Sequence, residues 1–571
     1  MGSDLRPIVN DQTGQLSMTN DSAASSRKLP LLASTAWSGG ARPAVFGLVG
    51  ALTLATAPNA SALPANGTVV GGVASITSNP NTVTIDQSSQ NAVINWKSFS
   101  IGKGESAKFN QPNSSAVTLN RVIGEDPSTI LGSISANGKV FLVNANGILF
   151  AKGAQVNVGG LVASTQDITN DNLMAGKYHF AGSSANAVVN QGAITANNGY
   201  IALLGANVDN EGVITARLGS VVLAAGSAMT LDVAGNGLLN VTIDSGAVKA
   251  LVANGGLIQA NGGQVLLSAQ AAGQLLKTVV NNTGIIDAQT VDSHNGIIKL
   301  LGDDQSGTVN VSGTLDASAP NGGNGGAIET SAAHVNIVPQ AKITTAAVTG
   351  RTGSWLIDPV DFTIGAGGNI SGATLSALLV TNSVNISTLP GATSGTMSGT
   401  PPVTNMNSTT VGPGDINVND AVSWTAAPST TTLSLNAYRD VNVNAAITAT
   451  NGNFLACCGR DVNMNAAITT TNGSASLSAG RNVNLNAVGA MTTTDGNIRI
   501  CAGLNINVDA KITLTRGSTI PAQSLNLPPG LLLQAGTGGT GPGVDGGTVI
   551  FGSLTGTESQ GSPRRELSPR S

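Results

Sequence analysis

The chain has little of what enzymes and nucleic-acid-binding proteins use for their chemistry. Its 571 residues include only 3 histidines and 3 cysteines, with 3% aromatic and 10% charged residues and a net charge of −4. Because charge is sparse and aromatics do not alternate with Lys or Arg, we expect no nucleic-acid partner. Three cysteines cannot form a disulfide framework, so packing alone has to stabilise the fold.

Groupings of residues typical of catalysis or metal binding are also missing from the sequence. No metal-ligand spacing links the three histidines, His179, His294 and His334. Asp303 and Asp304, with Lys299 nearby, could bind Ca²⁺ or polarise a sugar acid. No second charged cluster recurs one repeat away, so we interpret the two acids as loop residues. The sequence therefore predicts neither an enzyme nor a metal or other cofactor.

Small, β-branched and turn-forming residues are abundant instead. The chain has 73 glycines and 41% hydrophobic residues. This mixture suits narrow, repetitive β-structure, with short side chains inside and a turn at each corner. The high aliphatic content and low charge argue against intrinsic disorder.

An internal repeat dominates the C-terminal half. The segments DVNVNAAI, DVNMNAAI, NVNLNAVGAM and NINVDAKI begin at Asp440, Asp461, Asn482 and Asn505, at spacings of 21, 21 and 23 residues. Since strand side chains alternate, the apolar residues of each repeat should point inward and the polar ones outward. Stacked amides of one outward column could form an asparagine ladder, or could simply be surface polarity. That column comprises Asn442, Asn463, Asn484 and Asn507.

A weaker repeat runs through the N-terminal half. Gly-x-Ile or Gly-x-Leu triplets end at Ile194, Ile214, Ile258, Ile286 and Leu315, and we interpret the gap of 44 residues after Ile214 as two turns of 22. An antiparallel sandwich would also have short strands, but it would not have matching columns at a fixed period. We therefore predict an all-β chain folded as a right-handed parallel β-helix of about 20-residue turns with an N-terminal cap.

Residues 1–62 have the features of an extended signal peptide. An apolar stretch at 43–57 follows Arg27, Lys28 and Arg42, and Ala60-Ser61-Ala62 fits an A-x-A cleavage site after Ala62. A transmembrane anchor is the alternative, but the stretch is short for a bilayer and contains two glycines.

The segment NANGILFAKGAQVNVGGLVAST, residues 144–165, resembles the secretion domain of the filamentous haemagglutinin family, the exoproteins of bacterial two-partner secretion (TPS). The resemblance covers residues 63–331 and continues through the GSWLIDP phrase at 353–359. Ala145 stands where the family motif has proline, yet an Asn-x-Asn-Gly turn can still form because Asn and Gly tolerate the left-handed backbone region.

This resemblance implies a parallel β-helix that is exported through the periplasm by a cognate outer-membrane β-barrel transporter. It implies an extracellular or cell-surface location in a Gram-negative bacterium. The motif residues matched to transporter recognition are Asn144, Asn146, Gly147 and Ile148, although such a turn can also merely close a corner. The function implied first is that of an adhesin binding a host glycan or surface receptor. Alternatives are a polysaccharide-active β-helix enzyme, a haem- or haem-carrier-binding exoprotein, and a toxin stalk.

The domain organisation follows from these observations. We predict a signal peptide at 1–62, the secretion domain at 63–331, its continuation at 332–386, a Thr/Ser/Pro-rich linker at 387–428, β-helical repeats at 429–515 and a disordered tail at 516–571.

Overall fold

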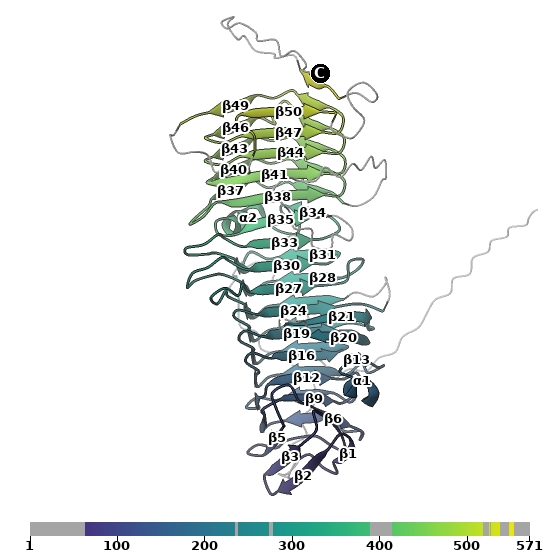
Figure 1. Ribbon diagram of the computed structural model, residues 1–571. Helices are drawn as coiled ribbons and strands as arrows, with labels where there is room; N and C mark the ends of the chain where they lie inside the picture. The colour runs from purple at the N-terminus through teal and green to yellow at the C-terminus, as the bar shows by residue number, and fades with distance from the viewer. Residues whose placement is uncertain are drawn as a thin grey trace, which may run out of the picture. The chain divides into compact units, whose positions relative to one another are not determined.

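The computed structural model describes residues 63–233, 238–272, 278–388, 414–517, 525, 527–536 and 547–552. Within them the backbone consists mainly of short β-strands, with two helices, α1 (Asn170–Met174) and α2 (Gly372–Leu379). Coils of strands stack on one another, and parallel sheets run along the stack (Figure 1). The fold is therefore a parallel β-helix, as predicted. The proposed signal peptide, with Ala60 and Ala62, lies outside the described residues.

One long sheet contributes a strand to each successive coil. Its strands are parallel, except that the first pairs antiparallel with the second. In stacking order they are β1 (Thr68–Gly71), β4 (Asn91–Trp96), β6 (Val117–Val122), β9 (Lys139–Val143), β12 (Gly160–Ser164), β16 (Tyr200–Gly205), β19 (Ser220–Ala225), β24 (Gln264–Ala269), β27 (Ile297–Leu301), β30 (Ala327–Ser331), β33 (Ser354–Asp358), β35 (Ser383–Ser387), β38 (Thr431–Ala437), β41 (Gly452–Cys458), β44 (Ala475–Ala479), β47 (Ile498–Ala502) and β50 (Leu531–Ala535).

Two further faces complete the coils of the N-terminal part. One face consists of β7 (Ser128–Ile130), β10 (Ile148–Phe150), β14 (Ala187–Asn190), β17 (Asn207–Asn210), β22 (Leu251–Asn254), β25 (Val279–Asn282), β28 (Thr308–Val311) and β31 (His334–Ile337). The other consists of β2 (Ala74–Asn79), β3 (Thr82–Gln87), β5 (Ser106–Asn110), β8 (Ser133–Ala136), β11 (Gln155–Asn157), β15 (Ala193–Thr195), β18 (Val213–Thr215), β23 (Leu257–Gln259), β26 (Ile285–Asp287), β29 (Thr314–Asp316) and β32 (Lys342–Thr344).

Two shorter sheets take the same places in the C-terminal part. The first consists of β34 (Phe362–Ile364), β36 (Ile416–Val418), β39 (Val441–Val443), β42 (Val462–Met464), β45 (Val483–Leu485), β48 (Ile506–Val508) and β51 (Val549–Phe551). The second consists of β37 (Val422–Thr425), β40 (Ile447–Thr450), β43 (Ile468–Thr471), β46 (Met491–Thr494) and β49 (Ile512–Thr515).

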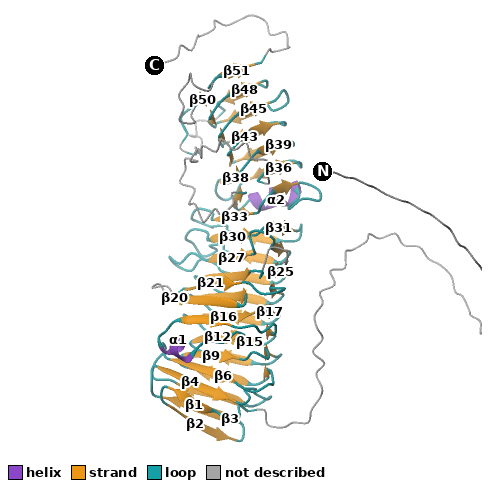
Figure 2. Ribbon diagram, turned by 90° about the vertical axis from the view of Figure 1, so that its right-hand side faces the viewer, coloured by secondary structure: helices purple, strands orange, loops and turns teal. Residues whose placement is uncertain are grey.

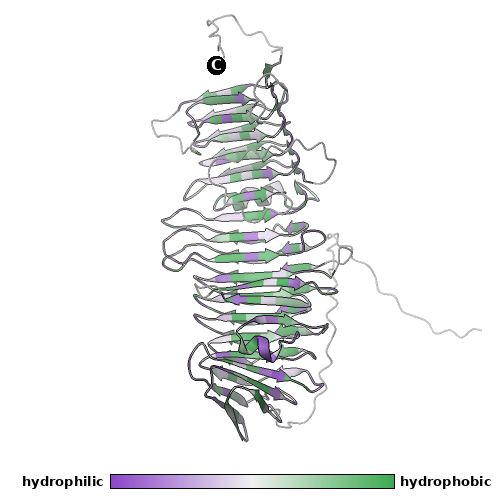
Figure 3. Ribbon diagram, turned by 45° about the vertical axis from the view of Figure 1, so that its right-hand side comes forward, coloured by the Kyte–Doolittle hydropathy of each residue, from purple (hydrophilic) through white to green (hydrophobic). Residues whose placement is uncertain are grey.

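The core lies inside the coils and is continuous along the stack. Val462 and Met464 of β42 are fully buried, whereas Asn463 between them is half-buried on the outer side. The same alternation recurs in β39 and β45, which pair in register with β42. Hydrophobic and hydrophilic positions accordingly alternate along many strands (Figure 3). Each coil buries its apolar side chains only against itself and its two neighbours.

Asparagine ladders run along the stack, both on the outer surface of the coils and inside them. On the outer face, Asn442, Asn463, Asn484 and Asn507 each donate an amide hydrogen bond to the preceding asparagine, over 2.7 to 3.0 Å, beginning at Asn417. A second ladder, not anticipated from the sequence, is fully buried. It links Asn190, Asn210, Asn254 and Asn282 over 2.7 to 2.8 Å.

The interpretation of the 44-residue gap as two turns is wrong. Ile214 of β18 pairs directly with Ile258 of β23, so the two residues belong to adjacent coils. The extra length contains β20 (Ala228–Val233) and β21 (Leu239–Ser245), an antiparallel pair that extends β13 (Tyr178–Ala181) into a separate three-stranded sheet. Ile214 stacks on Ile258 because both side chains point into the core. The number of residues in the loop between them can therefore vary.

The predicted linker is also partly wrong. Residues 389–413 lie outside the described residues, but β36 and β37 fall within 414–428 and both pair with the following coil. The preceding coil contains α2, which lies within the stack between β33 and β36 (Figure 2) and packs against β37 in the place of a strand. Ser371 caps this helix through the Thr374 amide, and Leu375, Leu378 and Leu379 face the core. The apolar spacing of these leucines is the helical signal that the sequence analysis missed.

The two ends of the stack differ. At the N-terminal end, the antiparallel pair β2–β3 and the antiparallel β1 cover the first parallel coil, which agrees with the expected cap. At the other end, β50 and β51 pair with β47 and β48, so the prediction of a disordered tail at 516–571 is wrong for these two strands. Leu533 and Val549 pack against the core and extend the inward columns, despite the Gly-rich sequence between the two strands.

The two ladders should differ in their contribution to stability. Replacing Asn254 by Ala leaves the side-chain amide donor of Asn210 and the side-chain oxygen of Asn282 buried without these partners, so we expect a loss of about 1 to 3 kcal/mol in the free energy of unfolding. Asn463→Ala, on the half-exposed ladder, is the matched control and should cost less because water replaces the lost partner. Thermal and urea unfolding of both variants measures the difference, and an equal loss would contradict it.

Candidate functional site

The Asn144–Ile148 motif forms a tight turn between β9 and β10. The backbone amide of Gly147 donates to the Asn144 carbonyl over 3.1 Å, and the Asn144 side-chain oxygen accepts from the backbone amide of Asn146 over 2.9 Å. Only Gly147 has a positive φ, at 111°, whereas Ala145 and Asn146 do not. The turn therefore uses the left-handed region at its glycine alone.

This turn is tied to the coils on either side. Asn144 is fully buried, and its amide donates to the Asp126 carbonyl and to the Ser128 hydroxyl, each over 3.0 Å. In the following coil, the hydroxyl of Ser184 and the amide of Asn186 both donate to the Ala145 carbonyl. These contacts fix the corner of one coil to both of its neighbours.

The folded turn offers little surface to a partner. Ile148 is 2% exposed, and its strand pairs with a strand on each side. The side-chain amide of Asn146 donates to the Gly124 carbonyl over 2.8 Å. Ala145 is the exposed residue of the motif. Any partner that reads the side chains of Asn144 or Ile148 has to do so before this part of the chain folds.

A second core outside the coils lies nearby. The sheet of β13, β20 and β21, together with α1, covers outward apolar residues of the long sheet, among them Phe141, Val162 and Tyr200. Arg121 holds this layer in place, because its guanidinium donates to Asp167 over 2.8 Å and to Asn170 over 2.7 Å. Sequence reasoning missed this layer, since its antiparallel strands do not follow the repeat.

The structure separates the polar residues that the sequence offered for chemistry. Among the described residues, no group of His, Cys, Asp and Glu could hold a metal ion. His179 lies 3.3 Å from Asp244 and shares a hydrogen bond with Thr230, on the sheet outside the coils. The Asp303 carboxylate accepts from the amides of two following residues and so closes a turn.

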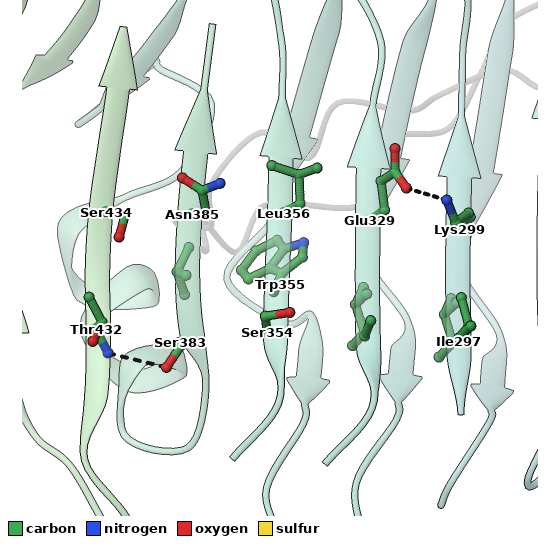
Figure 4. Close-up of a pocket in the computed structure, with 14 residues that line it drawn as sticks. Ile297, Lys299, Glu329, Ser354, Trp355, Leu356, Ser383, Asn385, Thr432 and Ser434 are labelled. Carbon is green, nitrogen blue, oxygen red and sulfur yellow. Dashed lines mark hydrogen bonds and ion pairs between the residues drawn. The ribbon is translucent and has the colours of Figure 1, made fainter. Parts of the chain in front are cut away.

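Lys299 instead belongs to a groove on the outer face of the long sheet. Its ammonium group lies 2.8 Å from the carboxylate of Glu329, one strand away. The groove has a volume of about 540 Å³ and extends over β27, β30, β33, β35 and β38. Ser354, Leu356 and Asn385 line it between the ion pair and β38 (Figure 4). Sequence reasoning did not anticipate this groove, because its lining residues are as many as 137 positions apart, from Ile297 to Ser434.

An acid with an altered pKa lies beside the groove. Burial raises the pKa of the Asp358 carboxyl to about 7, and the negative charge of Glu329 adds to the rise. Asp358 is the last residue of β33 and shares the outward face of that strand with Ser354 and Leu356. A group with this pKa changes charge near neutral pH.

Comparison with known protein families identifies the N-terminal part. Residues 60–330 match the family described as the TPS secretion domain. These residues are a TPS secretion domain. They include the Asn144–Ile148 turn, the cap and the additional layer around α1, whereas the groove extends from the end of the TPS domain into the coils that follow.

Two similar proteins, both from Haemophilus influenzae, have the same name. The chain is 36% identical over 260 residues to a heme/hemopexin-binding protein of Haemophilus influenzae, a match that covers 41% of this chain. It is 32% identical over 262 residues to the heme/hemopexin-binding protein of Haemophilus influenzae strain Rd, covering 44% of this chain. In each case the match spans 28% of the relative's length.

A solved structure is also similar. The crystal structure of the HMW1 secretion domain from Haemophilus influenzae matches with a TM-score of 0.46 and 22% identity, and the match covers 80% of this chain and 100% of the solved chain.

The turn of the TPS domain should accept the proline that its family motif carries. Ala145 is exposed, its amide has no backbone acceptor among the described residues, and the turn has the negative φ values of a type I turn. We expect Ala145→Pro to raise the free energy of unfolding by about 0.4 to 1 kcal/mol, because proline restricts the unfolded chain. Gly147→Ala should do the opposite, owing to the positive φ at that position. Thermal unfolding of both variants is the measurement, and destabilisation by proline would refute this account of the turn.

Asp358 should make stability depend on pH. Its folded pKa of about 7 lies above the ordinary value of 3.8, so its contribution to stability is present at low pH and is lost as the pH rises toward 7. Asp358→Asn should therefore raise the melting temperature at pH 8 and change it little at pH 4. The exposed Asp304→Asn is the control, with the same small effect at both pH values. A melting-temperature difference that does not change with pH would exclude Asp358 as the cause.

Proposed function

We propose that this chain is an adhesin-like exoprotein that leaves the cell by two-partner secretion through a cognate outer-membrane β-barrel transporter. The TPS domain at residues 60–330 is the observation that carries the export part of this proposal. We propose a binding role rather than a catalytic one.

The buried state of the motif supports a sequence of events in which recognition precedes folding. Asn144 and Ile148 are accessible to the transporter only in an unfolded chain, since both are buried in the folded coils. Once they have crossed the membrane, the Asn144 side chain bonds to the preceding coil, the backbone at Ile148 pairs with that coil, and the corner closes. Each coil that forms outside buries apolar surface against the one before it, and this free energy opposes the return of the chain.

Repeated polar columns support the adhesive part of the proposal. Beside the outer asparagine ladder, hydroxyl groups line the outward face of the β37–β49 sheet and repeat in register from coil to coil. One column consists of Ser423, Thr448, Thr469, Thr492 and Thr513, and all five are exposed or half-exposed. Such columns offer many equivalent hydrogen-bonding groups, so a repetitive ligand such as a surface glycan can make several weak contacts at once.

A second candidate function is binding of haem or a haem carrier. The two Haemophilus relatives, both named heme/hemopexin-binding proteins, favour it. A titration with haem, followed by its absorbance, tests this candidate directly. His179→Ala, His294→Ala and His334→Ala variants would then identify an axial histidine.

Export is tested by expressing the full chain in a Gram-negative host with and without its candidate transporter. We expect the protein in the medium or on the cell surface only when the transporter is present. Export without the transporter, or retention in the periplasm with it, would contradict the proposal. Cells that display the chain should then bind to a glycan-bearing surface, and cells without it should not.

A matched pair of variants separates recognition from folding. Asn144 and Asn190 are both fully buried and both form side-chain hydrogen bonds in neighbouring coils. If the transporter reads the motif, Asn144→Ala should reduce export much more than Asn190→Ala at equal loss of thermal stability. Equal export of the two variants would leave the turn with the role of closing a corner.

A further inference from the structure

The groove on the long sheet has the size of a site for a small ligand. Its volume of about 540 Å³ falls within the ~300 to 1,000 Å³ typical of such sites. It crosses five neighbouring strands, so at ~4.8 Å per strand it measures roughly 19 Å along the stack. A groove of this form fits an elongated ligand better than a compact one.

The lining combines aliphatic surface with uncharged hydrogen-bonding groups. Ile297 and Leu356 provide outward apolar side chains, and the hydroxyls of Ser354, Ser383 and Ser434 lie between or beside them (Figure 4). The polar faces of a sugar ring are matched by hydroxyl and amide groups, and its C–H faces are matched by aliphatic ones. This mixture is therefore suited to a saccharide.

Two polar groups of this face lack partners. The side-chain oxygen of Asn385, which lines the groove, is buried and accepts no hydrogen bond, and the hydroxyl of Ser387 two residues later is also buried without a partner. Buried polar atoms are normally hydrogen-bonded, so each such exception calls for a partner. Because the Asn385 side chain lines the groove, a hydroxyl of a bound ligand is a donor that can supply the missing partner.

The charges of the groove select against acidic ligands. Lys299 is the only cation among the lining residues, and Glu329 already neutralises it at 2.8 Å. Asp358 lies on the same outward face of β33 and adds a second acid nearby. A ligand carboxylate would thus meet carboxyl groups without a free cation to pair with.

We propose that this groove binds a neutral oligosaccharide of a few sugar units through Ser354, Asn385 and Ser434. The inference rests on the proposed adhesin function and locates its glycan-binding site in the coils that follow the TPS domain. Ser434 is 8% exposed, so the groove is the route by which its hydroxyl meets a ligand.

The test measures binding of soluble tetrasaccharides to the secreted full chain by saturation-transfer NMR and calorimetry. The neutral probes are maltotetraose, cellotetraose and lacto-N-neotetraose, and tetragalacturonic acid is the acidic probe. We expect at least one neutral probe to bind at about 1 mM or below and the acidic probe to bind more weakly. Failure of all neutral probes at that concentration, or tighter binding of the acidic probe, overturns the proposal.

Variants locate the site. Ser354→Trp places a large side chain in the groove from an exposed position, and it should weaken the affinity for the neutral probe by about tenfold or more. Ser75→Trp makes the same change at an exposed position of β2, on another sheet that has no part in the proposed glycan contacts, and its affinity for the probe should equal that of the parent. Thermal unfolding checks that both variants fold, and Asn385→Ala removes the amide without adding bulk. Unchanged affinity in both Ser354→Trp and Asn385→Ala places binding elsewhere.

Cell attachment distinguishes the failure of this inference from that of the adhesin function. If displayed parent and Ser354→Trp chains attach equally to glycan-bearing surfaces, the adhesin proposal stands and the groove is not its site. If the exported parent chain attaches to none of these surfaces, the adhesin proposal fails as well.

Discussion

Parallel hydrogen bonding between successive coils is the constraint on which the rest of this structure depends. Strands within the long sheet satisfy their backbone hydrogen bonds by pairing with the strands before and after them, so a residue lies above its counterpart in the next coil. Inward counterparts have to fill the same narrow space, which favours Val, Ile, Leu and Ala. Outward counterparts also lie above one another, so identical polar side chains of successive coils can form hydrogen-bonded ladders such as Asn442–Asn463–Asn484. Length variation is tolerated at the corners, where the pair β20–β21 is inserted without any shift in the register of Ile214 on Ile258.

The same constraint places the features that carry function. Because Asn144 closes a corner, its amide reaches the preceding coil and Ala145 accepts hydrogen bonds from the following one, so the motif is both conformationally specific and buried. The groove depends on stacking in another way. Its residues come from five coils and meet only because each coil places one strand at the same position in the sheet.

Export and stability are compatible in such a fold. The chain has no disulfide among its cysteines, all of which are free, and each coil is stabilised mainly by its neighbours. Folding can therefore proceed coil by coil from one end, with ion pairs that also bridge adjacent coils. Arg460 bonds Asp440 and Arg481 bonds Asp461 in this way, so each new coil gains a charge-assisted contact with the one below it.

The sequence by itself determined the parallel β-helix, the inward and outward columns of the C-terminal repeats and the presence of a TPS motif, because these depend on local alternation and on recurring spacing. It placed Val462, Asn463 and Met464 on their correct faces from period alone. Only the tertiary structure decided where insertions leave the stack, that α2 replaces a strand, and that Lys299 pairs with Glu329 rather than with the acids next to it in sequence. These outcomes depend on contacts between residues 20 or more positions apart, and strand periodicity does not record which coil will lie beside which.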